Sequence, residues 1–409
     1  MLARCVVAGK RAVLGARPKA ALSTSASSSA VFPREREGNV YAVNWSLTED
    51  GVVPVGDAFR NARVPLLTMR LGSKVDNGKV EVAKVAYTGK YALLEAGEGI
   101  SHGAFSDALA AQQAYMSSGI ELFVEDAALC AFAGGRVGVR VVTDSSAVAL
   151  IARTLLIPVP NRPVDHRARF DGWNLDPRWE EPEIVWTGEK AVVNDMQTTP
   201  KKGQRPIVAY VGGPGDQVAV QFVEANKKIV GANICVGGAA PMRALVDAIG
   251  HASTVLINEQ SKAGLALPAT TLVKGASTVV VVSADDSVID AAGGSLFGAY
   301  HSFISPAGVS ALWNGAIAAA PASPKASRLS PPLVVSSGKA AVALSPNNLA
   351  PAATSIVFFE KGAKKGPVSE ENAIQRLVAA SDEGKLETIK AILNGIKCST
   401  AGSMADIDM

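Results

Sequence analysis

Few residues of this chain have the types and the spacing that catalysis or metal binding requires. Neither the histidines nor the cysteines stand at the separations of a metal site, and no Gly-x-Ser-x-Gly sequence marks a nucleophilic serine. The four histidines are His102, His166, His251 and His301. The cysteines beyond the first thirty residues are Cys130, Cys235 and Cys398. We expect these histidines to be exposed or hydrogen-bonded and these thiols to be reduced, and the sequence predicts no metal and no cofactor.

One glycine-rich loop follows a predicted strand. Residues 212–215 read Gly-Gly-Pro-Gly, a composition that can cradle a phosphate when a helix begins directly after the loop. Here the alternation of Val218, Val220 and Phe222 predicts a second strand instead. We therefore expect a hairpin turn and no phosphate site at this loop.

The elements that would position these residues alternate between strands and helices. Runs rich in β-branched residues predict strands at 139–143, 207–211, 218–223, 228–235, 254–257 and 277–283. Helical spacing of apolar residues predicts helices at 145–157 and 242–249. The three strands around the glycine-rich loop suggest a β-meander, and the fold class is α/β, of mixed α+β type.

The first thirty residues have the composition of a mitochondrial transit peptide. They contain five basic residues, no acidic residue, and an end rich in serine and alanine. We expect cleavage between Leu22 and Val31, and a location in the mitochondrial matrix or on the matrix side of the inner membrane. The alternative is a disordered arm without a targeting function.

The remainder has the composition of a globular protein. The precursor has a net charge of +3, so the chain without its leader is slightly acidic, which argues against a nucleic-acid partner. Apolar residues make up 48% of the sequence, which is enough for a sizeable core. No uninterrupted apolar run has the length of about twenty residues that a transmembrane helix needs.

Two C-terminal segments differ from the rest in composition. Residues 291–332 contain no Asp, Glu, Lys or Arg before Lys325, which predicts either a buried or poorly ordered connection or a surface covered by a partner. Apolar runs then predict strands at 333–336 and 355–359.

The end of the chain predicts two helices, at 369–380 and 381–397, which are similar to one ankyrin repeat. One such repeat cannot bury its apolar face alone, so we expect the helical pair to pack on the body of the protein or on a partner. The expected division is a transit peptide (1–30), an α/β domain (31–290), the charge-poor segment (291–332) and a module of two strands and two helices (333–409).

One continuous segment resembles a known enzyme family. The run VRVVTDSSAVALIARTLLIP, from Val139 to Pro158, is similar without a gap to the N-terminal domain of phosphoenolpyruvate carboxykinases, in which a VRVVTE strand leads into an ALFARNMFIRP helix. The block 123–126 looks like the acidic strand that precedes this segment in the family, and the block 221–237 looks like a later strand and substrate loop. With residues 88–90 as a remnant of the family's TGRSPKDK loop, the resemblance covers about residues 88–286. It implies a mixed sheet with flanking helices.

The groups that act in the family are replaced in this chain. Its substrate-binding arginine falls on Lys90, and a lysine lacks the bidentate reach of an arginine. Its substrate-binding tyrosine falls on Cys235, and its lysine pair, which includes a metal ligand, falls on Ala240 and Pro241. Its metal-binding histidine has no counterpart except His251, which comes somewhat early.

The family's phosphate loop has no counterpart in the sequence. It would fall near residues 272–278, where a single glycine and a misplaced lysine cannot wrap a triphosphate. Asp285 and Asp286 either resemble the acidic metal-binding pair that follows in the family, or form a solvated turn at the end of a strand.

These observations predict a pseudoenzyme that serves as a structural or assembly subunit of a large mitochondrial inner-membrane complex. The host that fits best is the peripheral stalk or dimer region of an ATP synthase of green-algal type, with the other subunits as partners and as its link to the membrane. The alternatives are a divergent carboxykinase-like phosphoryl-transfer enzyme and a sensor that binds a small acid. The ligand-binding remnants for either alternative are Lys90, Arg140, Arg153, Asp285 and Asp286. In the structural interpretation, Arg140 and Arg153 are packing and ion-pair residues.

Overall fold

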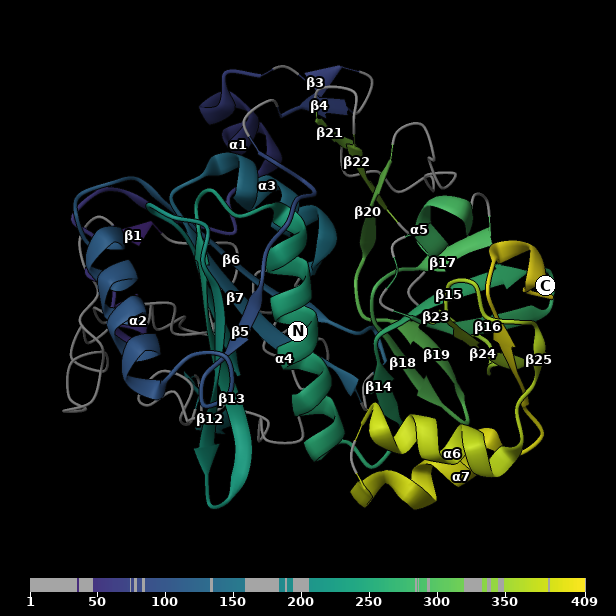
Figure 1. The fold of residues 1–409 in the computed structure, drawn as a ribbon. Helices are drawn as coiled ribbons and strands as arrows, with labels where there is room; N and C mark the ends of the chain where they lie inside the picture. Colours follow the sequence, from purple (N-terminus) through teal and green to yellow (C-terminus); the bar gives the residue numbers. More distant parts are fainter. Residues whose placement is uncertain are drawn as a thin grey trace, which may run out of the picture.

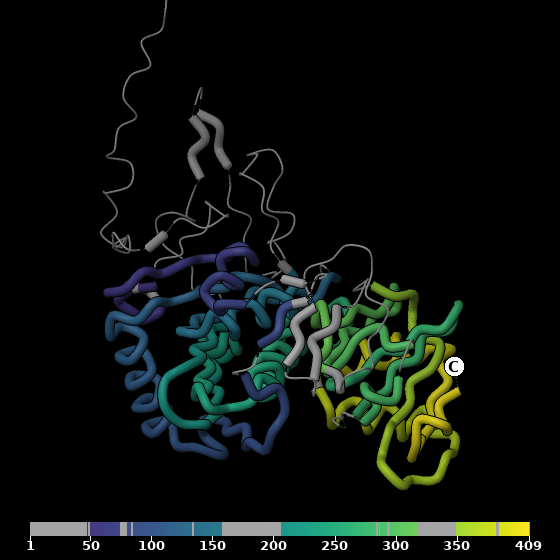
Figure 2. The backbone as a smooth tube through the Cα atoms, turned by 90° about the horizontal axis from the view of Figure 1, so that it is seen from above, coloured from purple at the N-terminus to yellow at the C-terminus, as the bar shows by residue number. Residues whose placement is uncertain are grey.

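The computed structural model describes most of the chain beyond residue 46. The described residues are 35–36, 47–73, 75–76, 79–82, 85–132, 135–158, 184–187, 190–193, 206–283, 285, 287–292, 295–319, 333–336, 340–344, 349–381 and 383–408. The predicted transit peptide, His166 and Asp286 lie outside them. The fold is mixed α/β, with helices flanking β-sheets, and it consists of two halves that lie side by side (Figures 1 and 2).

A nine-stranded sheet organises the first half. Its order is β1-β2-β6-β7-β11-β13-β12-β5, and β8 pairs with β6. The strands are β1 (Glu35–Arg36), β2 (Ala58–Arg60), β5 (Leu93–Glu95), β6 (Leu122–Leu129), β7 (Val137–Thr143), β8 (Ile157–Pro158), β11 (Ile207–Gly212), β12 (Val218–Ala225) and β13 (Lys228–Gly237). The central strands β6, β7 and β11 are buried along their whole length, which is why they read as continuous apolar runs.

Helices cover both faces of this sheet. Helix α2 (His102–Met116) packs on one face, and α3 (Ser146–Leu155) and α4 (Met242–Gln260) pack on the other (Figure 1). Helix α3 begins at Ser145, whose hydroxyl accepts a hydrogen bond from the backbone N–H of Val148. The predicted strand at 139–143 and the helix after it are confirmed.

The three strands around the glycine-rich loop do not form the predicted meander. Strand β13 lies between β11 and β12, parallel to the first and antiparallel to the second. The tight turn is therefore between β12 and β13, where Asn226 and Lys227 both have positive φ, as a two-residue hairpin turn requires. The loop 212–215 crosses over the end of β13 instead of closing a hairpin.

Helix α4 is longer than predicted. The sequence indicated a helix at 242–249 and a strand at 254–257, but one helix continues through both to Gln260. The β-branched residues Thr254, Val255 and Ile257 favour a strand locally, and burial of a continuous apolar face against the sheet overrides that preference.

The second half contains a six-stranded and a four-stranded sheet. The six-stranded sheet has the order β17-β15-β16-β24-β26-β25 and the four-stranded sheet the order β14-β18-β19-β23. The strands are β14 (Leu265–Leu267), β15 (Ala269–Lys274), β16 (Ser277–Val282), β17 (Leu296–Gly298), β18 (Ser302–Ser305), β19 (Gly308–Ala311), β23 (Leu349–Ala350), β24 (Ser355–Phe359), β25 (Gly366–Pro367) and β26 (Lys397–Ala401). The described part of the charge-poor segment includes β18 and β19, which are buried, so burial accounts for its composition.

The C-terminal helices pack on the body of the protein. Helix α6 (Glu370–Ala379) and helix α7 (Leu386–Leu393), which is preceded by a 3₁₀ turn (Glu383–Lys385), share a core with β14, β16 and β24. The buried Lys385 donates a hydrogen bond to the carbonyl oxygen of Ser261, at the end of α4. Of the two places expected for this helical pair, the body of the protein is confirmed.

The remaining elements are small. Strands β20 (Gly315–Ala319), β22 (Ala340–Leu344), β21 (Leu333–Ser336), β4 (Lys79–Glu81) and β3 (Val75–Asp76) form one sheet, and β9 (Ile184–Thr187) pairs with β10 (Lys190–Val193). Helices α1 (Val64–Leu71) and α5 (Ser287–Ala292) and the 3₁₀ turns Leu47–Asp50 and Met404–Asp406 complete the described elements. None of the described helices combines the length and the apolar character needed to cross a membrane. The four-part domain division stays a prediction.

Candidate functional site

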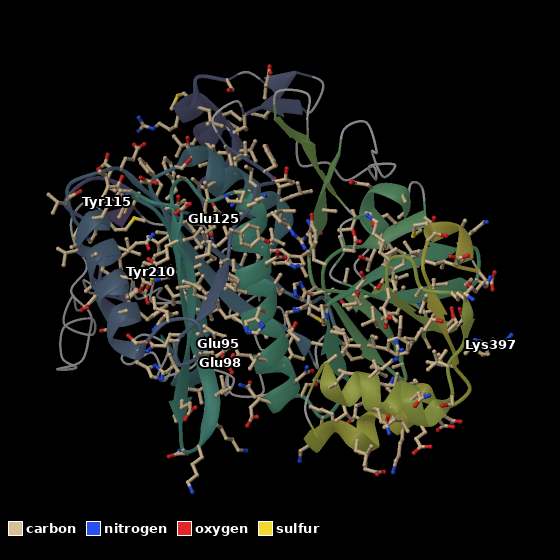
Figure 3. The ribbon with its side chains drawn as sticks, viewed as in Figure 1. Glu95, Glu98, Tyr115, Glu125, Tyr210 and Lys397 are labelled. Atoms are coloured by element: carbon tan, nitrogen blue, oxygen red, sulfur yellow. The ribbon has the colours of Figure 1, made fainter. Side chains whose placement is uncertain are left out.

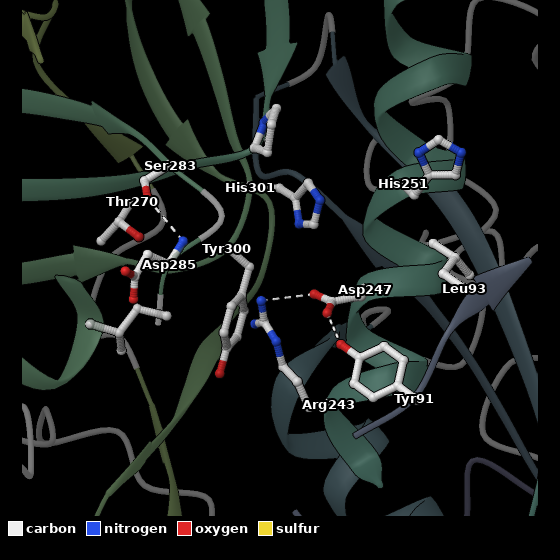
Figure 4. Close-up of a pocket in the computed structure, with 12 residues that line it drawn as sticks. Tyr91, Leu93, Arg243, Asp247, His251, Thr270, Ser283, Asp285, Tyr300 and His301 are labelled. Atoms are coloured by element: carbon white, nitrogen blue, oxygen red, sulfur yellow. Dashed lines mark hydrogen bonds and ion pairs between the residues drawn. The ribbon is translucent and has the colours of Figure 1, made fainter. Parts of the chain in front are cut away.

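A cavity of about 260 Å³ lies between the two halves and is the candidate site. One wall consists of α4 and the segment around β5, and the other consists of β15, the connection after β16, and the residues before β18 (Figure 4). The polar residues that line it are Tyr91, Arg243, Asp247, His251, Thr270, Ser283, Asp285, Tyr300 and His301.

Helix α4 supplies three of these side chains from one face. Arg243, Asp247 and His251 follow each other at intervals of four residues, which places them one above another along the helix. The opposite, apolar face of α4 packs on the nine-stranded sheet. Packing of this apolar face extends the helix past residue 249, and His251 therefore lies on the same helix face as Arg243 and Asp247.

Arg243 is the cation at the centre of the cavity, and its charge is balanced within the protein. Its Nη2 lies 2.8 Å from Oδ1 of Asp247, and its guanidinium carbon lies 3.9 Å from the ring centre of Tyr300. The Tyr91 hydroxyl donates a hydrogen bond to the other carboxylate oxygen of Asp247. Burial, and then the adjacent Asp247, raise the pKa of Tyr91, so its phenol keeps its proton.

Tyr300 reaches Arg243 from an unusual backbone conformation. Its φ is +68°, in the left-handed region that a bulky residue seldom adopts. The Tyr300 hydroxyl donates to the carbonyl oxygen of Ile317 at 2.9 Å and accepts a hydrogen bond from the N–H of the same residue. These two bonds hold the phenol ring in place over the guanidinium group.

The two histidines of the cavity have different surroundings. Nε2 of His251 lies 3.0 Å from Oε2 of Glu95, at a partly exposed position. His301 is only 7% exposed, and its Nδ1 has no hydrogen-bond partner within the described part of the chain. The expectation of an exposed or hydrogen-bonded histidine is thus wrong for His301, because its ring fills space that Gly250 leaves open on α4. Burial, and then Arg243 and His251, lower the pKa of His301 to about 3.

Of the predicted ligand-binding remnants that the structure describes, Asp285 alone lines this cavity. It lies in the connection between β16 and α5, where its Oδ1 accepts a hydrogen bond from the N–H of Ser287 at 2.8 Å. A hydrogen bond from the Ser287 side chain, and then the one from its backbone N–H, lower the pKa of Asp285, so the carboxylate is charged.

The segment 272–278, where the family's phosphate loop would fall, is a β-hairpin. Strand β15 ends at Lys274, and the two-residue turn Gly275-Ala276 leads directly into β16. A hairpin of this kind has no helix N-terminus to receive a phosphate. The strand-loop-helix arrangement lies one strand further on, at β16 and α5, and its connection carries Asp285.

The structure separates the three other remnants that it describes from the cavity and from one another. Lys90 is exposed and does not line the cavity. Arg140 and Arg153 lie on opposite faces of the nine-stranded sheet, because Arg140 pairs with residues on the α2 side while Arg153 projects from α3.

Both arginines contact acidic side chains at ion-pair distance, as the structural interpretation predicts. Arg140 is fully buried; its Nε lies 2.6 Å from Oδ1 of Asp126, and its Nη1 lies 2.7 Å from Oδ2 of Asp50. Nη1 of Arg153 lies 3.2 Å from Oε2 of Glu125. Glu125 and Tyr210, which packs with the α2-side core, mark the two faces of the sheet (Figure 3).

The replacements at the other family positions also lie away from the cavity lining. Cys235 is buried with Phe105 and Ala219 beneath α2, and this burial raises the pKa of its thiol to about 12. Pro241 precedes the first turn of α4 and serves as its N-terminal boundary. No side chain at position 235 reaches the cavity without crossing the sheet.

Four residues of the cavity were not predicted from the sequence: Arg243, Asp247, Tyr91 and Tyr300. The signal for the first two was the four-residue spacing to His251, which was hidden because the predicted helix ended at Ile249. The aromatic residues come from segments far away in the sequence and carry no local signal.

The cavity can hold a compact polar molecule, but its charges favour neither a phosphate nor a metal ion. The described residues contain no group of three or more His, Cys, Asp or Glu side chains that could hold a metal ion. Arg243 is matched by Asp247, and Asp285 adds a further negative charge. None of the known protein-family models matches this sequence, and none of the curated proteins does. The resemblance to carboxykinases therefore rests on the residues quoted above and stays a hypothesis.

Proposed function

We propose that this protein is a non-catalytic structural subunit of a large mitochondrial inner-membrane complex, with a fold descended from a carboxykinase-like enzyme. The observation that carries this proposal is the internal use of the cationic groups. Arg140 and Arg243 are each paired with carboxylates of the same chain, and Arg153 is hydrogen-bonded to the carboxyl group of Glu125. A nucleotide or a small di-acid would have to displace those carboxylates, at the cost of leaving buried charges unpaired.

The connection between β16 and α5 supports the same conclusion. A phosphate loop needs successive backbone N–H groups directed inward and a lysine between two phosphates. In this protein the connection presents the carboxylate of Asp285, which binds the N–H of Ser287 at the start of α5. A carboxylate at this point repels a phosphate group and occupies one of the N–H donors that would bind it.

The contacts between the two halves favour a fixed shape over an opening and closing cleft. The N–H of Cys130, at the end of β6, donates to the carbonyl oxygen of Leu312 at 2.8 Å, and the N–H of Asn314 donates to Leu155 at 2.7 Å. The main core also contains residues from both halves, including Phe303 and Trp313. A body of this kind suits a scaffold.

The proposed location and host rest on the sequence. The first thirty residues are basic and contain no acidic residue, which supports import into mitochondria. An imported protein that has lost its catalytic groups is a suitable candidate for a lineage-specific stalk subunit. The peripheral stalk or dimer region of an ATP synthase is the host we propose.

Native electrophoresis of detergent-solubilised mitochondria tests this proposal. We expect the chain to migrate with an assembly of megadalton size and to co-purify with ATP synthase subunits. Migration at its own mass would refute the structural role, whereas co-migration with a different complex would refute the host alone.

A binding measurement separates the scaffold from the enzyme. We expect no change in the melting temperature with ATP or GTP and Mn²⁺, because the described residues form no phosphate loop. Binding would be easy to detect, since a ligand at 100 times its Kd would add about 2.7 kcal/mol to the free energy of unfolding. A nucleotide-dependent rise of several degrees would favour the divergent phosphoryl-transfer enzyme. A rise with oxaloacetate alone would favour the sensor of a small acid.

A further inference from the structure

Helix α4 is packed on all sides except along one line of side chains. It lies where the first half of the protein faces the second (Figure 1), and thirteen of its nineteen residues are buried. Apart from the last residue, Gln260, those that keep exposed surface stand at every fourth position: Arg243, Asp247, His251, Val255 and Glu259. This accessible line is about 24 Å long, because an α-helix rises about 1.5 Å per residue. The helix therefore forms the floor of a long opening between the two halves.

Two cavities lie along this line and adjoin at its middle. The candidate-site cavity extends from Arg243 to His251 (Figure 4), and a second cavity, of about 360 Å³, extends from His251 to Glu259. His251, Pro268 and His301 line both of them, and neither is closed off from solvent. The side chain of His251 is 37% exposed, so it can be reached from both cavities. We call the two cavities together the α4 groove.

The second half of the α4 groove has apolar walls. Val255 forms its floor, Ile229 of β13 lies on one side, and Pro268 lies on the other. Ala379 and Ala380, at the end of α6, close the far side. Each of these residues keeps some exposed surface, so apolar side chains of a bound molecule can pack on them.

The charges of the α4 groove lie toward its two ends and are mainly acidic. Asp285 and Asp247 line the first half, and the exposed Glu259 lies at the other end. Among the described residues that line the groove, Arg243 is the only lysine or arginine, and its side chain is 11% exposed and paired with Asp247. Lys361 lies near Asp285 but does not line the groove. Accessible carboxylates at both ends favour a partner with cationic groups.

We propose that the α4 groove binds an extended segment of a partner protein, about seven residues long, with basic side chains at its two ends and apolar side chains between them. At about 3.3 Å per residue, seven extended residues match the length of the groove. The basic groups pair with Asp285 and Glu259, and the apolar side chains pack on Val255 and Ile229. This inference rests on the proposed scaffold function, because such a segment would belong to a partner subunit. The fixed arrangement of the two halves keeps the groove formed before binding, which lowers the cost of association.

Saturation-transfer NMR on the full-length protein tests this assignment with synthetic peptides. We expect acetyl-Lys-Ala-Val-Ala-Val-Ala-Lys-amide to bind in the millimolar range, and the analogue with glutamate at both ends to bind at least tenfold more weakly. Acetyl-Lys-Val-Lys-amide, which is too short to reach both ends, and spermine, which carries charge along its middle, should also bind at least tenfold more weakly. Equal binding of any of these three probes would overturn the proposal. No binding of the basic heptapeptide at 5 mM would overturn it as well.

Two variants connect peptide binding to the α4 groove. Val255→Lys places a cation on the floor, at a position with exposed surface, so we expect at least tenfold weaker binding of the basic heptapeptide. Glu259→Gln removes one acidic end and should weaken binding severalfold. The control Glu387→Gln, at a side chain of α7 that is 86% exposed and outside the groove, should not change it. Circular dichroism checks that each variant is folded, and unchanged binding by the folded Glu259→Gln or Val255→Lys protein would overturn the assignment.

The peptide experiment and the native-gel experiment can fail independently. The peptides are added to the isolated protein, so their binding does not depend on the host complex. If they do not bind and the chain still migrates with a megadalton assembly, the groove assignment alone is overturned. Migration of the chain at its own mass would overturn the scaffold function, and with it the assignment of the segment to a partner subunit.

Discussion

The buried ion cluster around Arg140 offers the sharpest test of the view that this arginine is structural. The Arg140 side chain has no exposed surface, and it contributes three bonds of 2.6 to 2.7 Å, two to Asp126 and one to Asp50. Each charge-assisted bond of this kind contributes about 1.5–3 kcal/mol, so their sum sets an upper limit for the effect of Arg140→Met.

The expected loss is smaller than that limit because part of the cluster remains. Nε of Arg60 lies 2.7 Å from Oδ2 of Asp126 and continues to neutralise it. Asp50, whose side chain is only 9% exposed, loses its ion pair with Arg140. Removing one partner from a buried pair usually costs about 3–5 kcal/mol, and we expect a loss in that range for Arg140→Met.

Equilibrium unfolding in urea at pH 7.5 measures this loss directly. Arg376→Met is the matched control, because Arg376 pairs with Glu360 at 2.8 Å on the surface, with side chains 39% and 61% exposed. Such an exposed pair contributes at most about 1 kcal/mol. A loss for Arg140→Met no larger than that of the control would refute the argument that burial makes this cluster important for the fold.

Two further predictions concern a carboxyl group and a glycine. Burial raises the pKa of Glu125 to about 8, and Arg153 opposes this only in part. Because the pKa in the folded state is above the unfolded value, the free energy of unfolding decreases as the pH rises from about 5 to 9. Glu125→Gln should flatten this pH dependence, which urea unfolding at pH 6 and pH 9 measures. An equally steep dependence in the variant would contradict the assignment. Gly250→Ala should lower the melting temperature, because a Cβ there would lie 2.1 Å from Cε1 of His301, whereas Gly103→Ala in α2, where a Cβ meets no atom within 4 Å, should leave it unchanged or raise it. Equal effects of the two substitutions would show that His301 does not depend on Gly250.

Much of the secondary structure could be predicted from local patterns. The strands β7, β11, β12, β13 and β16 and the helix α3 lie where the sequence indicates them. These elements have strong periodicity or continuous apolar runs, so the local preference and the buried environment agree. The run from Thr254 to Ile257 was misread because its local preference and its packing disagree.

The candidate site was much harder to predict. Among the marked residues that the structure describes, only Asp285, His251 and His301 line the cavity, and His301 was expected in a different environment. Lys90 and the two arginines of the carboxykinase-like segment lie elsewhere. A resemblance along the chain identifies related positions, but it does not show which face of a sheet each side chain takes.

The sequence by itself determined the mixed α/β class. It also offered burial as one of the alternatives for the charge-poor segment, and in the structural interpretation it gave Arg140 and Arg153 a role in packing and ion pairs. These follow from composition, spacing and charge, which act over a few residues. Only the tertiary structure decided the insertion of β13 between β11 and β12, the continuation of α4, and the meeting of Arg243 with Tyr300. Those features depend on contacts between segments that are distant in the sequence, and these contacts stabilise the fold only once the segments have packed together.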